Sequence, residues 1–90
     1  MKTEIVNGKR VKCYDNGGKC CDRYTVAYLD WEMDRGLYQG VGMSGSPFHP
    51  QGFGQHCMMK LGRHLGKRIA FKDLPADCQK LVEQDQEDTK

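Results

Sequence analysis

The chain of 90 residues has no long hydrophobic run, little proline and almost no excess of charge of either sign. No apolar stretch approaches the ~20 residues that a membrane-spanning helix needs, so we expect no membrane partner. The first residues, Met1-Lys2-Thr3-Glu4, lack the apolar core of a secretory signal, which indicates a cytoplasmic protein. The net charge of +2 excludes a histone-like protein and argues against disorder. The length predicts a single domain over residues 1–90.

The cysteines do not follow a pattern that is typical of a disulfide framework or a zinc site. They are Cys13, Cys20, Cys21, Cys57 and Cys78, an odd number in a chain without a signal peptide. The close pairs of cysteines or histidines that zinc sites usually contain, a few residues apart, are missing. Cys20-Cys21 together with His56-Cys57 remains one way to hold a metal. The other interpretation is reduced thiols, some packed as small hydrophobic groups, and we therefore assign no metal ligand and no cofactor.

The first half of the chain predicts strands separated by glycine turns. Asn7-Gly8, between the apolar pairs of residues 3–15, is the strongest short signal for a β-hairpin. A second turn is expected at residues 15–18. Residues 22–31 carry apolar groups on both faces, which indicates a central strand. Residues 32–36 are then expected to form a turn, and Leu37–Met43 a glycine-interrupted strand that is bulged or closely approached by other backbone.

The second half predicts a long loop, one more strand and a helix. Residues 44–66 are expected to form a glycine-rich loop, because Pro47 and Pro50 disfavour regular structure. Residues 67–72 read as a strand. Pro75 suits a first helical position, and Leu74, Cys78, Leu81 and Val82 form one apolar stripe over a helix of about 75–85. The acidic residues that follow are unfavourable near a helix C-terminus, so we expect fraying after Gln84 and a mobile acidic tail.

These elements predict an α+β fold, with a small antiparallel β-sheet of three to five strands and one C-terminal helix packed on it. The alternation of strands and helices that is typical of a parallel sheet is missing.

The most informative segment is Gly36–Met59, which contains no Asp, Glu, Lys or Arg although 29% of the chain is charged. Its glycines allow a close approach of backbone to another group, and its aromatic residues argue against disorder. Three interpretations compete: a structural lid over the sheet, a partner surface built from backbone amides with His49 and His56, and a catalytic acid–base role for one of these histidines. Gly-x-Gly at 40–42 and 52–54 matches no nucleotide-binding motif.

A basic run follows this segment. Lys60, Arg63, Lys67, Arg68 and Lys72 have no acidic residue among them. Five positive charges can neutralise phosphates or bind an acidic protein surface. The alternative is a solvated strand face that is balanced by the acidic C-terminal helix, and this alternative is favoured because aromatic residues for base stacking are nearly absent from the run.

Several motifs together resemble a group of small, functionally uncharacterised proteins of phages and bacterial mobile elements. They are Tyr14 to Lys19, Asp22 to Val26, Gly42 to His56, His64 to Ile69 and Leu74 to Leu81. The resemblance spans roughly residues 11–82. It implies a bacterial host cytoplasm and a product that modulates a host system, and it brings no established activity, cofactor or catalytic residue.

We therefore expect a non-enzymatic binding module, an accessory protein that binds or inhibits a host protein in an anti-defence type of role. The alternatives are a nucleic-acid-binding protein that uses the basic run 60–72 with Arg23, and a small His/Cys metal-dependent enzyme. No catalytic residue is assigned. The candidate partner-binding residues are Phe48, His49, Gln51, Phe53, Gln55, His56, Arg23, Tyr24, Arg63, Lys67 and Arg68.

Overall fold

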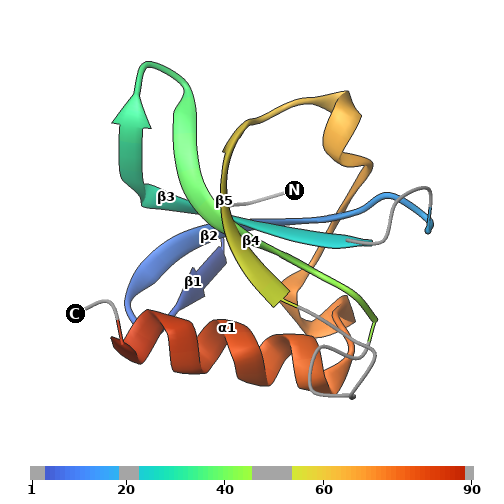
Figure 1. The fold of residues 1–90 in the computed structure, drawn as a ribbon. Coiled ribbons are helices and arrows are strands. Elements are labelled where there is room, and N and C mark those ends of the chain that lie inside the picture. Colours follow the sequence, from blue (N-terminus) through green and yellow to red (C-terminus); the bar gives the residue numbers. More distant parts are fainter. Residues whose placement is uncertain (1–3, 19–22, 46–53, 89–90) are drawn as a thin grey trace.

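The computed structural model describes residues 4–18, 23–45 and 54–88, which form a six-stranded antiparallel sheet and one helix (Figure 1). The strands are β1 (Glu4–Val6), β2 (Lys9–Asp15), β3 (Tyr24–Asp34), β4 (Leu37–Met43), β5 (Gly54–Lys60) and β6 (Lys67–Ile69). Two short 3₁₀ helices, η1 (Arg63–Leu65) and η2 (Phe71–Asp73), flank β6, and α1 spans Ala76–Asp88. The predicted α+β class with a C-terminal helix is confirmed.

The strands follow one another in the order β1-β2-β3-β4-β5, and β6 returns to β2. β1 pairs with the first half of β2, and β6 pairs with Cys13–Asp15 at its end. Because β3 lies along the opposite edge of β2, β1 and β6 share one edge. The chain between β5 and β6 therefore runs from one side of the sheet to the other (Figure 1).

The predicted hairpin at the start of the chain is confirmed. Asn7 and Gly8 both have positive φ, 51° and 79°, as the tightest two-residue hairpin turn requires. The second predicted turn is confirmed as well, since Gly17 and Gly18 have φ of 76° and 89°. Glycine turns therefore follow both β1 and β2, as the sequence predicted.

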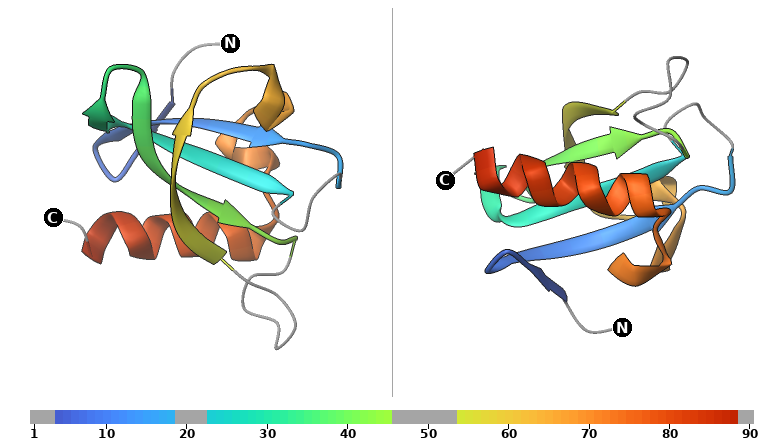
Figure 2. Two further views of the ribbon diagram at one scale, coloured as in Figure 1. Left: turned by 45° about the horizontal axis from the view of Figure 1, so that its top comes forward. Right: turned by 90° about the horizontal axis from the view of Figure 1, so that it is seen from below.

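The helix packs on one face of the sheet, and Figure 2 shows it lying across the strands. The core between them is apolar and consists of Val6, Val11, Cys13, Tyr24, Val26, Tyr28, Val41, Met43, Leu74, Cys78 and Val82. The stripe predicted for the helix thus supplies its buried face, with Leu81 half-buried beside it. No helix in the part of the chain that the structure describes has the length and apolar character to cross a membrane.

The close approach predicted for the glycine-interrupted strand occurs at Gly40. A Cβ at this position would lie 2.3 Å from the backbone oxygen of Val26 and 2.5 Å from the Cε of Met59. The pairing between β3 and β4 also shifts register between Ala27 and Glu32. The bulge predicted for Leu37–Met43 is therefore present, but its extra residues lie on β3. Glycine at position 40 lets three strands pack without a gap.

Three boundaries differ from the sequence prediction. The expected turn at residues 32–36 is shorter, because β3 continues to Asp34 and only Arg35-Gly36 form the turn. The expected strand over 67–72 ends at Ile69, and Phe71 lies in η2 instead. Both Ile69 and Phe71 still pack against the core. The helix continues to Asp88 instead of fraying after Gln84, since Gln86 is 1% exposed and thus lies in the protein interior.

The prediction of a loop over residues 44–66 is wrong in its second half. Gly54–Lys60 form β5, which pairs with the whole of β4. The residues of β5 have weak strand preference by themselves. Pairing with β4 and contact with α1 determine their structure, which is a tertiary effect that local composition does not reveal.

Candidate binding site at the edge of the sheet

β5 is the last strand of the sheet, so β4 occupies one of its edges and no described strand occupies the other. Seven consecutive residue pairs join the two strands, from Met43 opposite Gly54 to Leu37 opposite Lys60, without a register shift. A regular strand with one unpaired edge presents a row of backbone N–H and C=O groups that can pair with another chain. β5 is therefore a template for an added strand.

The edge of β5 lacks the features that usually protect an edge strand. Proteins block such edges with charges, proline, bulges or very short strands, whereas Gly54–Met59 contains no charge or proline and β5 has no bulge. At the other side of the sheet, β1 has only three residues. There the Glu4 carboxylate also accepts a hydrogen bond of 2.6 Å from the backbone N–H of Phe71. The absence of charge noticed in the sequence thus coincides with an open edge.

His56 lies on the face of β5 toward α1, where its Nε2 contacts Oδ1 of Asp85. The hydroxyl of Tyr28 donates a hydrogen bond of 2.6 Å to Oδ2 of the same carboxylate. Burial, with the hydrogen bond to Asp85 adding to it, raises the pKa of Tyr28 far above its ordinary value, so this phenol remains a donor at neutral pH. The side chain of Asp85 is only 12% exposed, whereas that of His56 is 53% exposed. A largely buried carboxylate thus orients an accessible imidazole beside the open edge.

Two hollows lie on opposite faces of β5. The one toward α1 has a volume of about 210 Å³ and is lined by Val41, Gly54, Gln55, His56, Leu81, Gln84 and Asp85. The one on the far face has a volume of about 680 Å³ and is lined by Thr25, Leu37, Cys57, Met58, Met59, Lys60, His64 and Leu65. A third, of about 230 Å³, lies away from β5 among Lys9, Tyr28, Asp30, Trp31 and Gln86.

The pleat of β5 separates His56 from Cys57. Successive residues of a strand point to opposite faces, and the two side chains accordingly border different hollows. They cannot jointly form half of a metal site, which corrects that interpretation of the sequence. The described residues contain no group of three or more His, Cys, Asp or Glu that could hold a metal. Cys20, Cys21 and His49, the other proposed ligands, lie outside the described residues.

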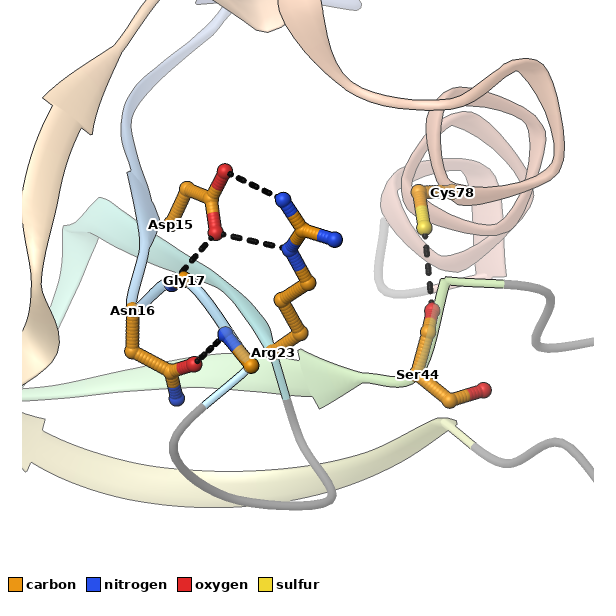
Figure 3. Close-up of polar contacts among 7 residues, drawn as sticks. Asp15, Asn16, Gly17, Arg23, Ser44 and Cys78 are labelled. Carbon is orange, nitrogen blue, oxygen red and sulfur yellow. Dashed lines mark hydrogen bonds and ion pairs between the residues drawn. The ribbon is translucent and has the colours of Figure 1, made fainter.

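The other described thiols are packing groups. Cys13 and Cys78 are fully buried in the core, as one interpretation of the sequence expected of some cysteines. Burial is the main cause that raises the pKa of Cys13 to about 12 and that of Cys78 to about 11. The Cys78 thiol also donates a hydrogen bond of 3.3 Å to the backbone oxygen of Ser44 (Figure 3).

Several of the basic candidates gather at the end of β2, on the opposite side of the sheet from β5. Arg23 contacts Asp15 through Nε at 3.0 Å and Nη2 at 3.3 Å (Figure 3). This pairing is the main reason that the pKa of Asp15 is lowered. Lys67 on β6 lies opposite Asp15 on β2 in the register of the two strands. The guanidinium of Arg68 lies 5.9 Å from the ring centre of Tyr14. These groups therefore interact with their own sheet.

The predicted candidates thus divide into four sets. Gln55 and His56 lie on β5 beside its open edge, while Arg23, Lys67 and Arg68 lie at the far side. Tyr24 is 8% exposed and belongs to the core, which corrects its assignment to a partner surface. The remaining candidates, Phe48, His49, Gln51 and Phe53, lie outside the described residues, as does the side chain of Arg63.

Sequence reasoning missed the partners of His56. Tyr28 was assigned to a central strand and Asp85 to an acidic tail. One signal was available: Asp85 lies four residues after Leu81 and three after Val82, so it continues the buried stripe of the helix. An acidic residue on such a stripe needs a hydrogen-bonding partner from the sheet.

Comparison of the chain with protein-family models, with curated proteins and with solved structures gives no match. The functional conclusion therefore rests on the geometry of β5 and its surroundings.

Proposed function

We propose that the chain is a non-enzymatic binding module that holds an extended segment of a partner protein against the open edge of β5. The observation that supports this proposal is the edge itself, which is seven residues long, uncharged over Gly54–Met59 and free of bulges. Strand addition to such an edge gains affinity from main-chain hydrogen bonds and specificity from pockets for alternate side chains.

The surroundings of β5 favour the same role. On the face toward α1, alternate side chains of an added strand would meet the oriented imidazole of His56 and the hollow of about 210 Å³ next to it. Met58 on the same strand is 57% exposed, and exposed methionine adapts readily to different apolar partners. These features provide a polar anchor and an apolar contact within one strand.

The sequence resemblance to proteins of phages and mobile elements adds the expectation that the partner is a host protein in the bacterial cytoplasm and that binding inhibits it. The geometry favours this role over a His/Cys enzyme, because His56 and Cys57 border different hollows. It also favours it over nucleic-acid binding, because Arg23 is paired with Asp15 and Arg68 lies over Tyr14.

The test uses an edge-blocking substitution with a matched control. Met58→Lys places a charge on β5, and a lysine on an edge strand opposes pairing with another chain. Met33→Lys makes the same change at a methionine that is 51% exposed on β3, away from β5. Affinity capture from a nuclease-treated bacterial lysate should retain a host protein on the unmodified chain and on Met33→Lys, and lose it on Met58→Lys.

Two results would contradict the proposal. Capture that survives in Met58→Lys would show that β5 is not the binding edge. Capture that disappears after nuclease treatment in all three forms would favour the nucleic-acid alternative, which should also show a steep decrease in affinity with salt.

A further inference from the structure

The larger hollow lies on the sheet face opposite α1. Figure 1 shows the chain leaving β5, passing through η1 and returning to β6. The hollow lies between this connection and the sheet, since its lining combines residues of β3, β4 and β5 with His64 and Leu65 of η1. Its volume of about 680 Å³ falls within the range of small-molecule sites.

Most of the lining is apolar. Leu37, Met58, Met59 and Leu65 contribute hydrocarbon and thioether groups, and Met59 is buried against the bare backbone of Gly40. Thr25, also buried, and Cys57 add a hydroxyl and a thiol. A ligand that fills this hollow therefore needs a substantial apolar body.

Among the described residues that line the hollow, Lys60 is charged, His64 adds a second group that can donate a hydrogen bond, and none is acidic. The imidazole of His64 lies beside Gly62, where a Cβ would be 3.1 Å from its Nδ1. The N–H of Leu65 donates a hydrogen bond of 3.2 Å to the oxygen of Gly62 and fixes this turn. Lys60 ends β5, and both Lys60 and His64 line the hollow.

We infer that this hollow binds a small amphipathic carboxylate, with its carboxylate at Lys60 and His64 and its hydrocarbon body against Met59 and Leu65. The sign of the ligand charge follows from the described lining, because a cation would meet Lys60 with no acidic partner among those residues. A carboxylate gains a charge-assisted hydrogen bond there. The apolar floor disfavours a bare phosphate or a nucleic-acid backbone, which has no group to fill it.

This inference does not depend on strand addition, because it concerns a small ligand of the hollow beside η1 and requires no partner protein. Met58 borders this hollow as well as the edge of β5, so the test uses other variants. A titration of the purified chain with a small carboxylate tests it directly. Decanoate is the probe, kept below the concentration at which it forms micelles, and decyltrimethylammonium, with the same chain and opposite charge, is the control.

Amide shifts in ¹H–¹⁵N spectra give the readout. Decanoate should cause saturable shifts centred on Thr25, Leu37, Lys60 and Leu65, and decyltrimethylammonium should cause none of comparable size. Lys60→Gln should weaken decanoate binding about tenfold. Lys72→Gln, at an exposed lysine on η2 outside the hollow, should leave the affinity unchanged.

The inference is overturned if both probes bind equally, if Lys60→Gln binds decanoate as tightly as Lys72→Gln does, or if the shifts lie elsewhere in the chain. Decanoate binding combined with a failure of lysate capture would remove the strand-addition proposal alone. Capture without decanoate binding would remove this inference alone.

Discussion

The hydroxyl of Tyr28 on β3 and the carboxylate of Asp85 on α1, 57 residues apart in the chain, are joined by a hydrogen bond of 2.6 Å. Asp85 also contacts His56 on β5. One carboxylate therefore links the centre of the sheet, its open edge and the helix, and it contacts the imidazole beside that edge.

Tyr28→Phe tests this link. The substitution removes the hydroxyl and leaves the ring in the core, so it should lower the free energy of unfolding by about 1–2 kcal/mol. Urea denaturation measures the change. Tyr38→Phe, at a half-buried tyrosine of β4, is the control and should have a smaller effect. Equal effects of the two substitutions would show that the bond to Asp85 contributes nothing specific.

The buried thiols predict a loss of stability in alkaline solution. Folding raises the pKa of Cys13 to about 12 and that of Cys78 to about 11, from the ordinary value of 9.0. A raised pKa stabilises the folded protein below the pKa of the unfolded chain, and this stabilisation is lost as pH rises toward the folded value. Each thiol should therefore lower the free energy of unfolding by ~1.4 kcal/mol per pH unit above about pH 9.

Urea denaturation between pH 8 and pH 11 measures this slope. Cys13→Ala and Cys78→Ala should each make the slope shallower, although both lower the stability at pH 8 by creating cavities. A slope that stays the same in both variants would contradict the assignment of these thiols as protonated core groups.

Gly40→Ala tests the close packing between β3, β4 and β5. The added methyl group would meet the backbone oxygen of Val26, which cannot move aside as a side-chain end could, so the free energy of unfolding should fall by about 3 kcal/mol. At Gly45, a Cβ would lie 4.0 Å from the nearest atom, in the ring of Tyr24. Gly45→Ala should therefore change stability by less than about 0.5 kcal/mol. Thermal unfolding of both variants gives the comparison, and similar melting temperatures would contradict the packing.

The features predicted correctly from sequence are those that local residues determine. Asn7-Gly8 favours one tight turn whatever surrounds it, and the spacing of Leu74, Cys78 and Val82 places one helix face in the core. The hydrogen bonds of β5 are supplied by β4, and its contacts by α1. A sequence of weak strand formers does not reveal either of these, so residues 54–60 were predicted to be part of a loop.

The candidate site was predicted only in part for the same reason. His56 was identified as one of two histidines in the uncharged segment Gly36–Met59, which contains most of β5. Its link to Tyr28 and Asp85 depends on the tertiary structure, which brings β3, β5 and α1 together. Lys60 was read as part of a basic run, whereas the structure places it with His64 beside an apolar hollow.

Hydrogen–deuterium exchange of the β5 amides, measured with the captured host protein and without it, tests the central claim most directly. Strand addition predicts that amides within Gly54–Lys60 that exchange rapidly in the free chain become protected in the complex, while those of β1 keep their rates. Unchanged exchange in β5 together with new protection at β1 or β6 would contradict the account. Protection of β5 that increases with the concentration of the chain alone, without the host protein, would also contradict it, because it would indicate self-association.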